Sequence, residues 1–234
     1  VAGVFEVFGS GTIALKVMPM VLALLAAVIT RQLAIELQLS RTARWCAPLL
    51  VWCGPAYAVL FSTKERGFYG VALVLAAAAP TLAVRLAKRP SLVDSLLLGL
   101  CVGLGLWTTP LTMAIALPAV AWLVAVRSQV VGELWAAVPA AALGALPWLW
   151  WNVTNGWGSL DGVATFGTTW WDRFFDWMVR QNVVMGIETP FVDDRQLVDW
   201  RWAGLVALAV VVAAATRRTG WKAPWFFVAM VIGY

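Results

Sequence analysis

Residues 95–126 read SLLLGLCVGLGLWTTPLTMAIALPAVAWLVAV, an apolar run without a charged side chain. The run is interrupted at Thr108-Thr109-Pro110, where proline ends or kinks a helix. As a helix, residues 95–107 would reach only about 20 Å, less than the roughly 30 Å hydrocarbon core of a bilayer. The run therefore forms either one long kinked helix or a hairpin of two short helices.

The rest of the chain shares this apolar character. Hydrophobic residues make up 62% of the 234 residues and the mean hydropathy is +0.82, whereas soluble domains are roughly 45–50% apolar. The alternating pattern of a transmembrane barrel is absent. We predict an all-α, polytopic transmembrane helical bundle of about seven to eight segments, two of them short. The expected segments are 13–30, 45–62, 69–84, 95–107, 109–126, 134–151, 203–216 and 223–234.

The distribution of charge predicts the topology. Ten of the 17 Lys and Arg residues gather at 31–44, 85–89, Arg127 and 217–222. By the positive-inside rule these loops face the cytoplasm. A hairpin at Thr108-Thr109-Pro110 puts Asp94 and Arg127 on one side and preserves the charge pattern of every later loop, so we predict the hairpin. All charged residues fall in loops or at helix ends, which argues against an ion-coupled transporter.

The stretch from Pro147 to Trp202 holds nine of the 16 tryptophans and seven of the 12 acidic residues. We expect residues 152–201 to form an extracytoplasmic aromatic and acidic loop within a single transmembrane domain that covers residues 1–234. Aromatic residues at 170–178 recur at near-helical spacing, which predicts helices lying in the membrane interface. An aromatic belt that only anchors the fold is the alternative interpretation.

Several classes of site are excluded by composition. Histidine is absent, and the three cysteines lie in apolar segments without metal-ligand spacing, which argues against zinc, haem and His-based triads. The net charge is +5, and its excess of basic residues lies in the predicted cytoplasmic loops, where ten Lys and Arg residues stand against only Glu36, Asp94 and Glu133. We therefore expect no nucleic acid partner. The cofactor stays open; a divalent metal ion at Asp193-Asp194 is one alternative to a simply exposed pair.

A series of local motifs, taken in order, resembles a known family. The motifs are VFEVFGS (4–10) with ALKV (14–17), STKERGFYG (62–70), the glycine-rich stretch 99–118, GALPW (144–148) with Asn152 and Gly156-Trp157, and WDRFF (171–175) leading to MGI (185–187). Together they are similar to the polyprenyl-phosphate-sugar-dependent GT-C glycosyltransferases, the membrane superfamily of protein O-mannosyltransferases and lipid A aminoarabinose transferases.

The resemblance implies a function and its partners. It implies transfer of a sugar from a polyprenyl-phosphate carrier to an unknown acceptor, at the extracytoplasmic face of the cell inner (plasma) membrane, with the lipid bilayer as surroundings. In this family the catalytic aspartate lies in the first outer loop. That loop would precede Val1, so we expect a fragment that lacks the first helix and its loop.

The best catalytic candidate within the chain is Glu65, between Lys64 and Arg66. The acid would orient the acceptor or a metal, and the two cations would neutralise the leaving phosphate. A solvated charged turn is the equally weighted alternative. The further substrate-binding candidates are Tyr69, Thr108, Thr109, Asn152, Trp157, Arg173 and Arg180.

Each further candidate also has a plainer interpretation. Tyr69 could be an interface anchor, Thr108 and Thr109 could cap a broken helix, and Arg173 and Arg180 could form an ion pair with Asp176. Two rivals to the enzyme remain: a non-catalytic transporter or flippase for a lipid-linked sugar, and a structural membrane subunit. No internal repeat supports the transporter.

Overall fold

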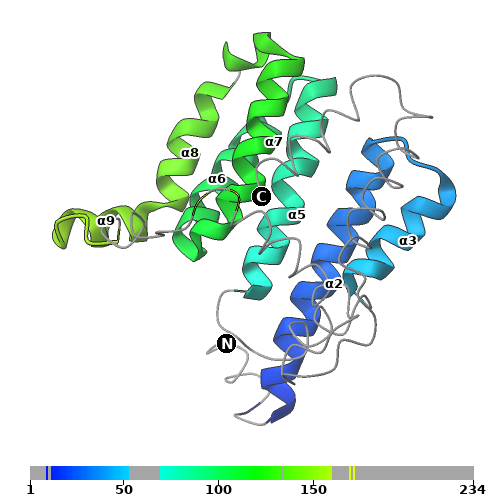
Figure 1. Cartoon of the computed structure of the whole chain (residues 1–234), viewed down its shortest axis with the longest axis horizontal. Coiled ribbons are helices and arrows are strands. Elements are labelled where there is room, and N and C mark those ends of the chain that lie inside the picture. The colour runs from blue at the N-terminus through cyan, green and yellow to red at the C-terminus, as the bar shows by residue number, and fades with distance from the viewer. Residues whose placement is uncertain are drawn as a thin grey trace.

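A computed structural model describes residues 9, 12–52, 69–132, 134–159, 169 and 171, and among them it is helical with no strand. The elements are α2 (Thr12–Glu36), α3 (Arg41–Trp52), α5 (Tyr69–Lys88), α6 (Leu92–Thr108), η1 (Pro110–Thr112), α7 (Met113–Val126), η2 (Ser128–Gly132), η3 (Leu134–Ala136), α8 (Ala137–Gly144) and α9 (Leu146–Thr154). The α5, α6 and α7 helices form the centre, with α2 and α3 on one side and α8 on the other (Figure 1).

Two helices, over Lys16–Glu36 and Tyr69–Lys88, are long and apolar enough to cross a membrane. The bent pair formed by Leu134–Gly144 and Leu146–Thr154 makes a third candidate if it counts as one span. The α6 helix and the η1–α7 segment are apolar but shorter. An all-helical membrane protein is thus supported, while the expected segments 203–216 and 223–234, and most of 45–62, lie outside the described residues.

The predicted hairpin at Thr108-Thr109-Pro110 is confirmed. At the start of α6, Asp94 Oδ1 lies 3.0 Å from Arg85 Nη2 near the end of α5. Just after α7, Arg127 Nη1 donates a hydrogen bond of 2.7 Å to the Leu86 carbonyl, again near the end of α5. The beginning and the end of the run therefore lie beside the same end of α5, so the chain reverses between them.

The single segment predicted at 134–151 is not one straight helix. Its two halves, Leu134–Gly144 and Leu146–Thr154, meet at 58°, and α9 turns away from the bundle in Figure 1. The break falls at Ala145, and Pro147 occupies the first turn of α9. Because proline lacks an N–H and its ring crowds the preceding turn, it starts a new helix more readily than it continues an old one.

The α6 and α8 helices cross at unusually short range. A Cβ atom on Gly99 would lie 2.0 Å from the Ala137 carbonyl oxygen, and one on Gly103 would lie 2.0 Å from that of Ala141. Glycines four residues apart on one helix thus face alanines four residues apart on the other. This pairing of small residues lets helices associate by backbone contact in lipid.

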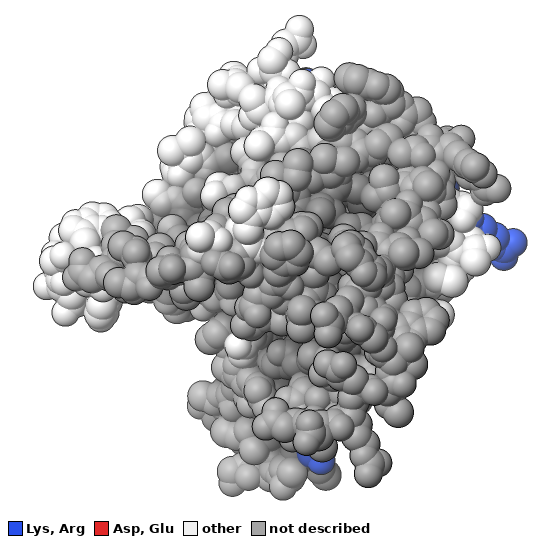
Figure 2. All heavy atoms as spheres, in the orientation of Figure 1, with Lys and Arg blue, Asp and Glu red and all other residues white. Residues whose placement is uncertain are grey.

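The described helices expose many large apolar side chains as well as burying them. Leu86, Leu98 and Leu123 are fully buried, whereas Leu117 and Val138 on other helix faces are 57% and 69% exposed. In the face drawn in Figure 2 the described atoms are mostly uncharged, with basic atoms near the margins. Such extensive apolar exposure fits contact with lipid rather than with water.

Candidate functional site

The described site candidates lie toward one end of the bundle, on α5, α6 and the outward-turned α9. Tyr69 is the first residue of α5 and is 41% exposed; Thr108 and Thr109 end α6; and α9, which carries Asn152, packs against α6. Because α5 and α6 run antiparallel, the start of the first lies beside the end of the second. We call this the hairpin end.

The predicted catalytic loop lies outside the described residues. Lys64, Glu65 and Arg66 directly precede α5 in the sequence, and Arg173 and Arg180 belong to the later part of the chain. Their assignment therefore stays a prediction. Tyr69 at the start of α5 is the described residue nearest to Glu65 in sequence, four positions later.

The two threonines of the hairpin stand where α6 ends: Thr108 is its last residue, and Thr109 caps both α6 and η1. Thr108 donates a hydrogen bond of 2.6 Å to the Leu104 carbonyl, one turn earlier. Thr109 is buried, and its Oγ1 accepts a hydrogen bond of 3.4 Å from the Leu111 N–H at the start of η1. Thr112 in turn donates to the Thr109 carbonyl at 2.8 Å. Thr109 is thus a cap, as the capping interpretation expects, whereas the Thr108 hydroxyl bonds back within α6. Contact of either residue with substrate stays a prediction.

Asn152 forms buried hydrogen bonds that hold the chain where it leaves the C-terminal end of α9. It is fully buried, its Nδ2 donates to the Trp148 carbonyl at 2.9 Å, and its Oδ1 accepts from Ser159 Oγ at 2.6 Å. Its carbonyl accepts the Trp157 N–H at 2.9 Å. The described role of Asn152 is thus to fold the chain back after α9.

The backbone conformation of Trp157 is part of this turn. Its φ of +64° lies in the left-handed region, which residues other than glycine seldom adopt. Its ring meets that of Trp148 edge-on, with centroids 6.1 Å apart, an arrangement that aromatic pairs favour. Trp157 is 44% exposed, and contact of its ring with a substrate stays a prediction.

Replacing Asn152 with alanine should destabilise the protein by about 1–3 kcal/mol, because the Trp148 carbonyl and the Ser159 hydroxyl would lose a buried partner. The matched control is Asn155→Ala. That amide donates to the Trp151 carbonyl at 2.7 Å but is exposed, so its loss should cost no more than about 0.5 kcal/mol. Chemical denaturation in mixed micelles measures both. Equal losses would contradict the structural role assigned to Asn152.

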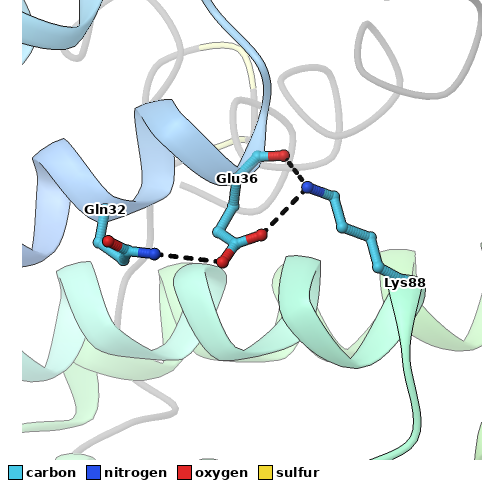
Figure 3. A network of polar contacts seen from close by, with 3 residues as sticks. All are labelled: Gln32, Glu36 and Lys88. Atoms are coloured by element: carbon cyan, nitrogen blue, oxygen red, sulfur yellow. Dashed lines mark hydrogen bonds and ion pairs between the residues drawn. The ribbon is translucent and has the colours of Figure 1, made fainter.

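The opposite end of the bundle is charged. Lys88 at the end of α5 bonds both the Glu36 carbonyl and Glu36 Oε2, the latter at 3.0 Å, and Gln32 supports the same carboxylate at 3.2 Å (Figure 3). Arg85, Asp94 and Arg127 lie at this end too. We call it the charged end, and it brings together the basic loops 31–44 and 85–89 with Arg127.

The burial of Asp94 was not predicted from the sequence. As predicted it stands at a helix end, yet it is only 2% exposed. Its N–H is capped by Ser91 Oγ at 3.2 Å, its Oδ1 pairs with Arg85, and among the described residues its Oδ2 has no hydrogen-bond partner. The Ser91-x-x-Asp94 spacing of a helix start was the available sequence signal.

No group of three or more potential metal ligands occurs among the described residues. Comparisons with known protein families, with curated proteins and with solved structures find no match to this chain.

Proposed function

We propose that this protein is a multi-pass GT-C-type glycosyltransferase of the inner membrane, which moves a sugar from a polyprenyl-phosphate carrier to an acceptor at the extracytoplasmic face. One observation carries the proposal: the described substrate candidates lie toward the hairpin end, whereas the described basic loops meet at the opposite, charged end. By the positive-inside rule, the charged end faces the cytoplasm. The substrate candidates then face the extracytoplasmic side, where a lipid-linked sugar donor would be used.

The shape of the hairpin end supports this proposal. The short α6 and α7 helices turn at Thr109, and α9 bends by 58° away from the direction of α8. Its Trp150 and Trp151 are 71% and 50% exposed, and tryptophan prefers the headgroup level of a membrane. A helix in that position would border the region where the phosphate of a lipid carrier meets its acyl chain.

The proposed chemistry is a substitution at the anomeric carbon. The acceptor oxygen forms a bond to that carbon while the bond from the carbon to the phosphate oxygen breaks; the phosphate takes the electron pair and a carboxylate takes the acceptor's proton. Lys64 and Arg66 would neutralise the leaving phosphate, the first as a point charge and the second as a bidentate fork. Glu65 would orient the acceptor hydroxyl or a divalent metal, and Tyr69 would stack on the sugar.

Transfer of labelled sugar from polyprenyl phosphate to envelope acceptors, measured with the purified full-length protein in lipid, tests the proposal. Glu65→Gln should lower the rate about 100-fold, because a misplaced acceptor loses its near-attack geometry. The control is Glu133→Gln, which removes a carboxylate that lies between α7 and α8 in the sequence and should keep the wild-type rate.

Two results would overturn the proposal. The first is no transfer from any polyprenyl-phosphate sugar by the wild-type protein. The second is wild-type transfer by Glu65→Gln, which would remove Glu65 from the site. If the protein moved the intact lipid-linked sugar across a vesicle membrane without transferring the sugar to an acceptor, it would instead be a flippase.

A further inference from the structure

Three arginines of α2 and α3 flank the turn that joins these helices, at one corner of the charged end. The α2 helix ends at Glu36, Gln38 adopts a φ of +56°, and Ser40 Oγ accepts the Ala43 N–H at 3.3 Å to start α3. This reversal places Arg31 of α2 beside the first turn of α3, which contains Arg41 and Arg44.

Arg31 lies against α3 through an aromatic ring. Its Cζ is 4.6 Å from the centroid of the Trp45 ring, a distance at which a cation is attracted to an aromatic face. Its Nε is shielded from solvent and has no hydrogen-bond acceptor among the described residues. The guanidinium is thus oriented by the ring while part of its hydrogen-bonding capacity is unused.

The two arginines of α3 stand at an unfavourable place for a positive charge. The first turn of a helix carries the positive end of the helix dipole, which favours anions, yet the first turn of α3 contains no acidic residue. Arg44 Nε donates to the Leu39 carbonyl at 2.8 Å, and Arg41 is exposed. Both charges therefore add to the positive potential of the helix end.

No acid among the described residues forms an ion pair with these three arginines. Glu36 is the acidic residue nearest in sequence, and its carboxylate already bonds Lys88 at 3.0 Å and Gln32 at 3.2 Å. Among the described residues, therefore, no acid compensates the positive charge of the α2–α3 corner, and basic atoms show at the edge of the molecule beside α3 in Figure 2.

Apolar side chains adjoin the arginines along both helices. On α3, Trp45, Leu49 and Leu50 are 54%, 53% and 64% exposed. On α2, Leu25 and Val28 are 44% and 58% exposed. A ligand that fits this corner has an anionic head at the arginines and hydrocarbon chains that continue along α2 and α3.

We propose that the α2–α3 corner, defined by Arg31, Arg41, Arg44 and Trp45, is a binding site for one anionic phospholipid. Basic groups between helices at a membrane surface attract anionic headgroups at about 1 kcal/mol per Lys or Arg. The site lies at the charged end, away from the hairpin end where the sugar donor is proposed to bind. It does not depend on which reaction, if any, the protein catalyses.

Native mass spectrometry of the purified full-length protein, with phosphatidylglycerol or phosphatidylcholine added to the detergent, tests the site. We expect the wild-type protein to retain phosphatidylglycerol more tightly than phosphatidylcholine. Arg41→Gln should weaken phosphatidylglycerol binding about five-fold, the equivalent of one lost surface charge. The triple replacement of Arg31, Arg41 and Arg44 by glutamine should weaken it about 100-fold.

The matched control is Arg89→Gln, which removes an exposed charge from the loop after α5 at the same end and should leave binding unchanged. Arg41 has no described contact that its replacement would break, so this variant decides the test if the triple variant fails to fold. The proposal is overturned if Arg89→Gln and Arg41→Gln weaken binding equally, or if the wild-type protein does not distinguish the two lipids. Equal competition by inorganic phosphate at the same concentration would also overturn it, since it would show a phosphate site and not a lipid site.

Discussion

Replacing Gly103 with alanine is expected to lower the free energy of unfolding by about 3 kcal/mol, near the upper part of the range for overpacked interiors. The added methyl carbon would lie 2.0 Å from the Ala141 carbonyl oxygen and 2.8 Å from the Ala145 nitrogen. Both are backbone atoms, so they cannot rotate away as a side chain would. The two helices must separate, and the contacts between α6 and α8 weaken along their length.

The same substitution at Gly132 is the control, because a Cβ there meets nothing within 4 Å. Gly132→Ala should change stability by no more than about 0.5 kcal/mol. Chemical denaturation in mixed micelles measures both variants. If Gly103→Ala and Gly132→Ala unfold at the same denaturant concentration, the close crossing of α6 and α8 is wrong.

Replacing Asp94 with alanine should destabilise the protein by about 3 kcal/mol, since removing one partner of a buried ion pair leaves the other charge uncompensated. The carboxylate is only 3% exposed and the Arg85 side chain 32% exposed. The substitution also removes the acid from the first turn of α6, where a negative charge is favourable. The loss of stability is measured from the fraction of unfolded Asp94→Ala protein as a function of denaturant concentration.

Glu36→Ala provides the comparison at the same end of the bundle. Its partner Lys88 is 42% exposed, so water replaces the lost carboxylate and the loss should be about 1 kcal/mol or less. A second variant separates charge from packing: Asp94→Leu combined with Arg85→Met should recover part of the stability, because an apolar pair leaves no buried charge. A loss at Glu36 as large as that at Asp94 would contradict the difference in burial.

The candidate site was only partly accessible to sequence reasoning. The pattern of Thr108-Thr109-Pro110 predicted a turn, and the structure places Thr109 there as the cap of η1. Asn152 was singled out from a motif, but its complete burial follows from Trp148 and Ser159 folding around it. Whether an amide faces a ligand or the interior depends on such neighbours, and hydrophobic periodicity does not report them.

The expected 134–151 segment shows the same limit at the level of the fold. Its composition predicts a helix of spanning length, since apolar residues continue on both sides of Ala145. The bend follows Gly144, where an added Cβ would lie 2.8 Å from the Leu104 nitrogen and 2.9 Å from the Leu100 carbonyl oxygen of α6, and Pro147 stands in the first turn of α9. The composition of the segment shows that it is apolar along its whole length, but the bend arises from tertiary packing.

The sequence by itself determined that the described chain forms apolar helices that reverse at Pro110. Backbone polar groups must pair within the segment where water is absent, so long apolar runs become helices, and proline interrupts them. Only the tertiary structure decided which helices touch and which polar groups are enclosed. The Gly99 and Gly103 contacts with α8, the burial of Asp94 against Arg85 and the arginine corner of α2 and α3 each join residues of different helices. Their energies arise from distances between those residues, which periodicity along one helix does not contain.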